Sequence, residues 1–163
     1  MSAPVPGGLK KCLGIAVVIA LTGIFLSGPA LSAERRDGLV SWVIDGDTFE
    51  VRSGERVRLI GVNAPEYTPW KNRVEPHGKE ALFFARRLLK GQKVYLETDI
   101  RPKDRYGRTL AYVYLDDGTF VNRRLVEEGY ATAKFYPPNG RHRQVLEEAQ
   151  KRAHLDKKGI WKK

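Results

Sequence analysis

The chain has only one cysteine, Cys12, which lies near its N-terminus. A single thiol cannot form an internal disulfide, so the fold has to be stabilised by a hydrophobic core. A zinc site built from cysteines is excluded for the same reason. Histidine is also scarce: His77, His142 and His154 are widely separated. None of them has an Asp or Glu at the sequence spacing that a shared metal site would need. We interpret all three histidines as surface residues.

Only one long apolar run is present, at residues 12–28, and it reads CLGIAVVIALTGIFLSG. Two lysines precede it and the small residues PALSA follow it, which is the three-part pattern of a secretory signal peptide. The run is shorter than the roughly 20 residues of a spanning helix. We expect residues 1–33 to be a signal peptide, cleaved after Ser32 or Ala33. This predicts a secreted or periplasmic protein without stable membrane association; an uncleaved membrane anchor is the alternative.

Acidic residues are the minority among the charged side chains, with 19 Asp and Glu against 29 Lys and Arg, and the net charge is +10. The hydrophobic content of 42% and the charged content of 29% are typical of a globular domain and argue against disorder. A basic balance of this size favours a polyanionic partner such as nucleic acid, a heparin-like polymer or an anionic membrane. A basic surface without a dedicated partner is the alternative.

Alternating apolar residues predict five short strands. Three of them fall within LVSWVIDGDTFEVRSGERVRLIGV at 39–62, with turns at DGD and SGE. A fourth is KVYLETD at 93–99, and the fifth begins a hairpin at 109–121 that turns at Asp117 and Gly118. Helices are expected at residues 79–91, 122–129 and 141–159. We therefore predict an α+β, β-rich domain at 34–163, with an OB-type five-stranded barrel as the first candidate and an open sheet as the alternative.

Residues typical of helix caps mark the ends of the expected helices. Asn122 is a plausible N-cap of the second helix, and Gly91 and Gly129 are expected to end the first and second helices. Two polar loops remain, EYTPWKNRVEPHG at 66–78 and IRPKDRYGR at 100–108. Loops of this length in a small domain are often functional, and the second one is strongly basic.

Acidic residues in a basic chain need an explanation, because carboxylates would repel a polyanionic ligand. Asp45 and Asp47 flank Gly46, and Glu66 follows the strand that carries Arg58. Hydrolysis of a phosphodiester is helped by a cation held by carboxylates, by guanidinium groups on the phosphoryl oxygens and by a base that activates water. Oxygen ligands of this kind suit Ca²⁺ or Mg²⁺. The pattern therefore favours a metal-assisted phosphodiesterase over a protein that only binds nucleic acid.

The combination of motifs resembles the staphylococcal nuclease (thermonuclease) family over nearly all of the chain after residue 33. The matching segments, in the order of the family, are VIDGDTF at 43–49, RLIGVNAPE at 58–66, DRYGRTLAYVY at 104–114, VNRRLVEEGYA at 121–131 and GIW at 159–161. The resemblance implies an OB-fold barrel with three helices. It also implies a calcium-dependent endonuclease of DNA and RNA, largely independent of sequence, that leaves 3′-phosphate products.

The resemblance assigns a role to individual residues. Asp47 corresponds to the principal metal carboxylate, Asn63 falls where the family usually has a second Asp, and Ala64 falls where a backbone carbonyl completes the metal site. Glu66 corresponds to the general base or water-orienting residue, and Arg58 and Arg108 correspond to the two arginines that clamp the phosphate. Contacts to the nucleotide are implied for Arg105, Lys134 and Tyr136.

Two departures from the family pattern matter for function. Asn63 keeps an oxygen ligand but removes a charge, so we expect weaker calcium binding, with Mg²⁺ as the second candidate. Lys134 lies where the family can present an aromatic ring to the nucleotide, so a positive charge replaces a side chain that could stack on a base. We expect a monomer that acts on DNA and RNA, preferably single-stranded. The alternative, prompted by Asn63, is a catalytically silent OB-fold module that binds single strands.

Overall fold

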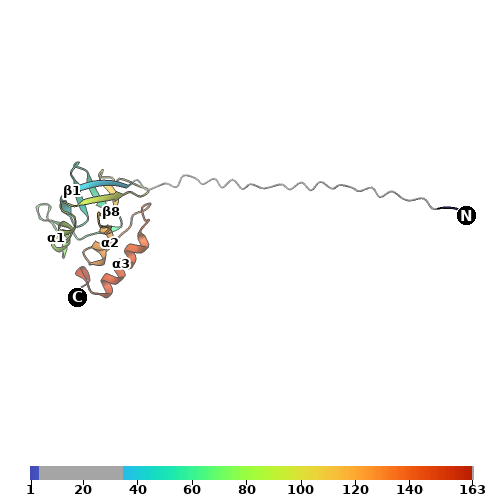
Figure 1. Cartoon of the computed structure of the whole chain (residues 1–163). Coiled ribbons are helices and arrows are strands. Elements are labelled where there is room, and N and C mark those ends of the chain that lie inside the picture. Colours follow the sequence, from blue (N-terminus) through green and yellow to red (C-terminus); the bar gives the residue numbers. More distant parts are fainter. Residues whose placement is uncertain (4–34, 163) are drawn as a thin grey trace. The chain divides into compact units, whose positions relative to one another are not determined.

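The structure is a computed structural model that describes residues 1–3 and 35–162 (Figure 1). The predicted signal peptide, apart from its first three residues, lies outside the described residues, so the boundary at residue 33 stays a prediction. Within the described part of the chain, no helix is long and apolar enough to cross a membrane.

Five strands form a closed barrel in the order β1-β2-β3-β8-β7. They are β1 (Arg35–Asp45), β2 (Thr48–Val51), β3 (Arg56–Leu59), β7 (Lys93–Glu97) and β8 (Thr109–Leu115). All neighbouring strands are antiparallel except β3 and β8, which pair in parallel. The predicted α+β class and the five-stranded barrel with three helices are confirmed, and the open-sheet alternative is wrong.

Apolar and polar residues alternate along the strands, and this alternation points the apolar side chains into the barrel, where they form its core. Inward side chains of the strands, such as Phe49, Val57, Leu96 and Val113, are 0–1% exposed. The tight turn between β1 and β2 depends on Gly46, because a Cβ atom there would lie 2.6 Å from the Cβ atom of Ala64. This turn therefore holds its two flanking aspartates against the segment that contains Ala64.

Three helices complete the core: α1 (Gly78–Leu89), α2 (Val121–Glu127) and α3 (Arg143–Leu155). Their buried positions lie three or four residues apart, as in Ala81, Ala85 and Leu89 of α1. Gly91 and Gly129, which lie just beyond α1 and α2, have φ angles of +73° and +72°. Both helices thus end at a left-handed glycine, as predicted.

One local prediction is wrong, and two others hold only in part. Asn122 is not an N-cap: α2 begins at Val121, and the side chain of Asn122 is buried, accepting from Val113 N (2.9 Å) and donating to Ile60 O (2.8 Å). The predicted hairpin turns at Asp117 and Gly118 as expected, with Leu115 N donating to Thr119 O (3.0 Å), but its second strand is only an isolated antiparallel bridge between Tyr114 and Phe120. His142, predicted to lie on the surface, is only partly exposed: its side chain is 25% exposed and its ring lies 3.3 Å from Glu97 Oε1.

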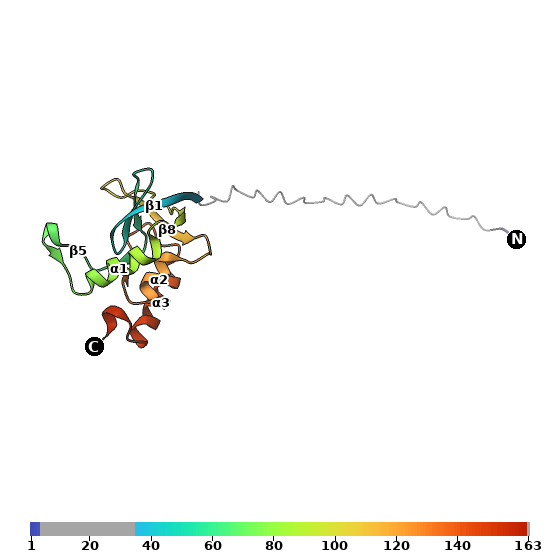
Figure 2. The same ribbon diagram turned by 60° about the vertical axis from the view of Figure 1, so that its left-hand side comes forward.

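Short strand pairs flank the barrel. β4 (Val62–Asn63) pairs with β9 (Thr132–Ala133), which joins the segment after β3 to the segment after α2. The predicted loop at 66–78 contains a small hairpin, in which β5 (Tyr67–Thr68) pairs with β6 (Arg73–Val74) around the 3₁₀ helix η1 (Pro69–Lys71). Figure 2 shows this hairpin projecting from the body of the domain. A second 3₁₀ helix, η2 (Gly159–Trp161), follows α3.

Candidate active site

One cavity of ≈ 290 Å³ is lined by four of the residues predicted to be functional, Asp47, Arg58, Glu66 and Arg108. They come from four segments: the turn between β1 and β2, strand β3, the chain after β4 and the residue just before β8. We call this space the carboxylate cavity, because Asp45 also lines it. The fold therefore brings three carboxylates to one place together with four arginines and one lysine, from segments dispersed over the sequence.

Asp47 is held in a fixed orientation by three groups. Its Oδ1 accepts from Thr48 Oγ1 (3.0 Å), and its Oδ2 accepts from Ala64 N (2.8 Å) and lies 2.7 Å from Arg58 Nη1. Burial raises the pKa of Asp47, while the Arg58 guanidinium and the hydrogen bond from Ala64 act in the opposite direction. Arg58 is thus the nearby positive charge that compensates a buried carboxylate.

Asp45 has a carboxyl group in the same crowded space. Burial raises the pKa of Asp45 to about 7, and the negative charges of Asp47 and Glu66 add to the effect, against a hydrogen bond from Gly46 N. Crowded carboxylates of this kind repel one another, and a bound cation would relieve the repulsion. The electrostatics of the cavity therefore fit a hard divalent cation.

The predicted metal-binding residues are only partly brought together. Asn63 and Ala64 line a neighbouring cavity of ≈ 550 Å³, the side cavity, which shares Glu66 and Arg73 with the carboxylate cavity. Ala64 is linked to Asp47 through its backbone N–H. Among the described residues, no three His, Cys, Asp or Glu side chains are arranged to hold a metal ion by themselves. The metal site expected from Asp47, Asn63 and Ala64 therefore stays a prediction.

Arg108 is oriented by the loop that precedes it. Its Nε donates to Asp104 Oδ2 at 2.7 Å, and Asp104 Oδ1 accepts from the backbone N–H groups of Tyr106 (2.8 Å) and Arg108 (3.0 Å). The guanidinium of Arg108 also lies 5.4 Å from the centre of the Tyr106 ring. Arg108 is therefore a preorganised donor at the edge of the carboxylate cavity.

The three residues predicted to contact the nucleotide share a third cavity, of ≈ 510 Å³. Arg105, Lys134 and Tyr136 line it together with both Arg58 and Arg108. We call it the aromatic cavity. Tyr136 is 62% exposed and Lys134 Nζ lies 5.6 Å from the centre of its ring. An aromatic face and several cations thus lie next to the carboxylate cavity, connected to it through the two arginines.

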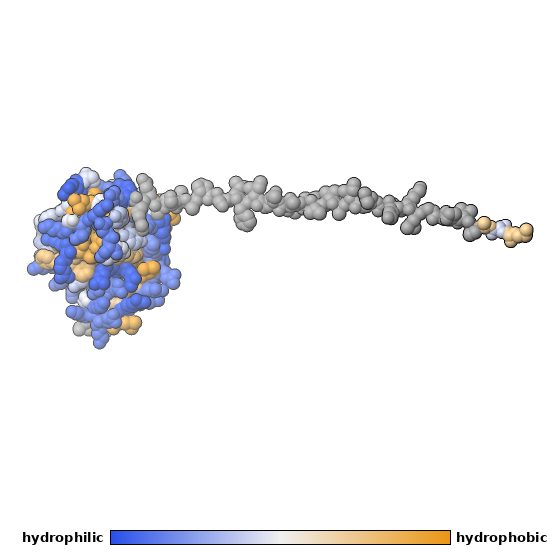
Figure 3. Space-filling view, in the orientation of Figure 1, coloured by the Kyte–Doolittle hydropathy of each residue, from blue (hydrophilic) through white to orange (hydrophobic). Residues whose placement is uncertain are grey.

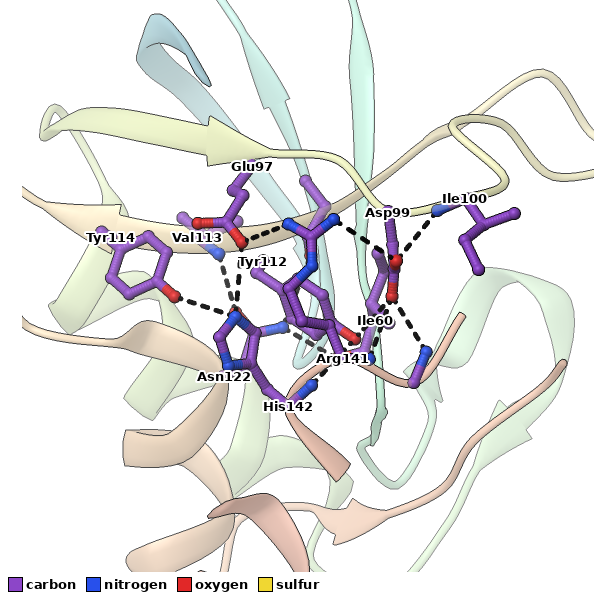
Figure 4. A network of polar contacts seen from close by, with 12 residues as sticks. Ile60, Glu97, Asp99, Ile100, Tyr112, Val113, Tyr114, Asn122, Arg141 and His142 are labelled. Atoms are coloured by element: carbon purple, nitrogen blue, oxygen red, sulfur yellow. Dashed lines mark hydrogen bonds and ion pairs between the residues drawn. The ribbon is translucent and has the colours of Figure 1, made fainter. Parts of the chain in front are cut away.

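Polar side chains join the two loops beside the aromatic cavity, and Asn139 among them is buried. Asn139 accepts from Arg101 N (2.7 Å) and donates to Arg101 O (2.8 Å). Asp99 Oδ2 accepts from Gly140 N (2.9 Å) and Arg141 N (3.1 Å), as Figure 4 shows for the network around Arg141. Arg141 in turn donates to Glu97 Oε1 (2.8 Å). These contacts fix the loop before Arg108 against the loop after Tyr136.

Sequence reasoning missed several residues of the site. Tyr106 lies between the two cations of its loop, with the Arg105 guanidinium 4.8 Å from its ring centre, and it lines the aromatic cavity. Lys71 and Arg73, from the hairpin after Glu66, line the carboxylate cavity. The only signal for these two residues in the sequence was the length of the polar loop at 66–78. It suggested a functional loop, but it did not show which of its side chains line the cavity.

Comparison with known proteins agrees with this arrangement. The family model of the staphylococcal nuclease homologues matches residues 56–163. A thermonuclease of Staphylococcus intermedius is 51% identical over 128 residues, which cover 77% of this chain and 76% of that protein. A thermonuclease of Staphylococcus hyicus is 46% identical over 162 residues, which cover 94% and 95%. Endonuclease YhcR of Bacillus subtilis (strain 168) is 36% identical over 138 residues, which cover 77% of this chain and 11% of that protein.

Proposed function

This chain belongs to the staphylococcal nuclease family and is a nuclease, a hydrolase of phosphodiester bonds, and we propose that it is a calcium-dependent endonuclease of DNA and RNA that leaves 3′-phosphate products. The observation that carries the proposal is the convergence of Asp47, Arg58, Glu66 and Arg108 on one cavity. A module that only bound nucleic acid would have no use for buried carboxylates at the point where the phosphate enters.

The two arginines are proposed to bind the scissile phosphate. Arg58 and Arg108 line both the carboxylate cavity and the aromatic cavity, so a phosphate between the two spaces lies within their reach. A guanidinium group can donate two parallel hydrogen bonds to phosphoryl oxygens, and it stabilises the negative charge that grows on them in the transition state. Asp104 keeps Arg108 oriented for this task.

Glu66 is proposed to accept a proton from the attacking water or to orient that water. Asp47, the side chain of Asn63 and the carbonyl of Ala64 are proposed to hold the cation, which Asn63 binds as a neutral ligand. Such a cation supplies a Lewis acid that stabilises charge on the phosphoryl oxygens. The hydrogen bonds from Thr48 and Ala64 to Asp47 keep this carboxylate in place before the substrate arrives.

Binding of the substrate is proposed to favour single strands. Tyr136 in the aromatic cavity can stack only on a base that has left the duplex, and Arg105 and Lys134 attract the phosphates on either side of it. Stacking is tolerant of base identity, which agrees with cleavage that is largely independent of sequence. The protein is further proposed to act as a monomer that is secreted or exported to the periplasm after loss of residues 1–33.

A cleavage assay on the chain lacking residues 1–33 tests the proposal. Heat-denatured DNA and RNA are incubated with Ca²⁺, with Mg²⁺ or with a chelator, and the products are treated with a 3′-phosphatase before electrophoresis. We expect cleavage that needs Ca²⁺ and products whose mobility changes after phosphatase treatment. Cleavage with Mg²⁺ alone contradicts the calcium requirement. Binding without cleavage under any metal contradicts the activity and favours the silent binding module.

A further inference from the structure

The hairpin at residues 67–74, called here the 67–74 arm, begins and ends at the active site. Glu66 precedes it and Glu75 follows it, and these two residues are joined by two hydrogen bonds, from Glu66 N to Glu75 Oε2 (3.0 Å) and from Glu75 N to Glu66 O (2.9 Å). The arm is therefore anchored at the proposed catalytic carboxylate and projects from it, as Figure 2 shows.

The side chains of the arm suit a nucleic acid. Its sequence, YTPWKNRV, contains no acidic residue. Trp70, in η1 at the outer end of the arm, is 70% exposed. Trp42, which is 53% exposed, already has the guanidinium of Arg86 5.1 Å from its ring centre, whereas no ring or cation of the described residues stacks on Trp70. Trp70 thus presents an exposed indole, and the cationic residues Lys71 and Arg73 follow it closely in the chain.

The arm and the aromatic cavity contribute different side chains around the carboxylate cavity, and Lys134 lines both the aromatic cavity and the side cavity. Lys71 and Arg73 line the carboxylate cavity, and Arg73 also lines the side cavity, but no residue of the arm lines the aromatic cavity. Tyr136 lines only the aromatic cavity. A strand with one base in the aromatic cavity and its phosphate between Arg58 and Arg108 would therefore continue toward the arm.

We propose that the 67–74 arm binds the nucleotide on the other side of the scissile phosphate, with Trp70 stacked on its base and with Lys71 and Arg73 on the flanking phosphates. This rests on the proposed function, in which a single strand occupies the aromatic cavity. The occupant is a nucleic acid strand because the cations of the arm face the same cavity as the phosphate-binding arginines. On the face seen in Figure 3 the surface is largely hydrophilic, with apolar residues in small groups, which suits an extended polyanion.

Oligonucleotides of increasing length test the arm. Affinities of the chain lacking residues 1–33 for a nucleoside 5′-phosphate and for thymidine oligomers are measured by fluorescence in chelator, so that no cleavage occurs. We expect Trp70→Ala to weaken binding of the longer oligomers roughly tenfold and to leave the affinity for the mononucleotide unchanged, because only longer ligands reach the arm. Trp70→Phe should restore most of the loss, and the matched control Trp42→Ala should bind like the wild type.

Cleavage measurements separate the outcomes. If the wild type cleaves and Trp70→Ala binds every oligomer like the wild type, the role of the arm is wrong although the nuclease activity stands. If the wild type fails to cleave but Trp70→Ala still loses affinity only for long oligomers, the arm is confirmed while the proposed mechanism fails. Binding of Trp70 to anionic lipid vesicles, with no effect on oligomers, would also overturn the proposal. An unchanged urea midpoint shows that each variant is folded.

Discussion

Arg58 Nη1 lies 2.7 Å from Asp47 Oδ2 and donates at 2.9 Å to the carbonyl oxygen of Val62, so one guanidinium group both compensates the buried Asp47 carboxylate and fixes the chain that leads to Asn63. The side chains of Arg58 and Asp47 are only 16% and 7% exposed. An ion pair this sheltered from water contributes much more than a surface pair when one partner is removed. Arg58 is therefore expected to act in stability as well as in catalysis.

We predict that Arg58→Ala lowers the free energy of unfolding by about 3 kcal/mol in chelator, because it leaves the Asp47 carboxylate buried without its partner. Arg108→Ala is the matched comparison: its partner Asp104 keeps two backbone donors, so the loss of stability should be small. Both variants should lose roughly 10²–10³ in cleavage rate. Urea unfolding and single-turnover cleavage measure the two effects. Equal stability of the two variants would contradict the role given to Arg58.

Asn63 provides a prediction about the metal. Replacing it by Asp adds a negative charge at the proposed metal site, so Asn63→Asp should bind Ca²⁺ roughly tenfold more tightly. Titration calorimetry with Ca²⁺ measures the dissociation constant directly. Asn72→Asp, which adds the same charge in the same side cavity but on the 67–74 arm, is the control. Equal gains in both variants would mean that general electrostatic attraction, rather than ligation by residue 63, sets the affinity.

The network around Arg141 predicts how stability depends on pH (Figure 4). Burial acts to raise the pKa of Asp99, but hydrogen bonds from Arg141, Gly140 and Ile100 outweigh it and lower the pKa below the ordinary value of 3.8. A lowered pKa in the folded state stabilises the fold above pH 3.8, and this contribution is lost as the pH falls through the folded-state pKa. Protonation of Asp99 should therefore lower the stability of the fold in acid.

The test compares wild type with Asp99→Asn by urea unfolding between pH 7 and pH 3. At pH 7 the variant should be less stable by about 2 kcal/mol, because the hydrogen bonds that the backbone N–H groups of Ile100, Gly140 and Arg141 donate to a charged carboxylate are weakened. The difference should shrink as the pH falls below 4. Asp156→Asn, which removes an exposed carboxylate after α3, serves as the control. A difference that stays constant with pH would contradict this assignment.

The sequence predicted the barrel well because period-two alternation and turn residues are local signals. Residues such as Phe49 and Val57 alternate with polar neighbours, and the turns at Gly46 and Gly54 separate the strands where expected. The convergence of Asp47, Arg58, Glu66 and Arg108 was predicted through motif order, not through geometry. The sequence alone does not show how close these four side chains lie in space, because they are up to 61 positions apart along the chain.

What could not be predicted depends on contacts between distant segments. Asn122 has the local signature of an N-cap, but its side chain satisfies buried backbone groups of Val113 and Ile60 instead. His142 has no carboxylate near it in the sequence, and Glu97 reaches it only because β7 lies beside the start of α3. The positions of Lys71 and Arg73 at the carboxylate cavity likewise follow from the hairpin and its anchoring at Glu75.

The most direct test of the account is single-turnover cleavage by Glu66→Gln, which keeps the shape of the side chain but cannot accept a proton as a carboxylate. With saturating Ca²⁺ and a single-stranded oligomer, the rate should fall roughly 10²–10⁴-fold. Oligomer affinity in chelator and the urea midpoint should stay those of the wild type, and Glu80→Gln, in the exposed first turn of α1, should cleave normally. Wild-type cleavage by Glu66→Gln would contradict the central claim.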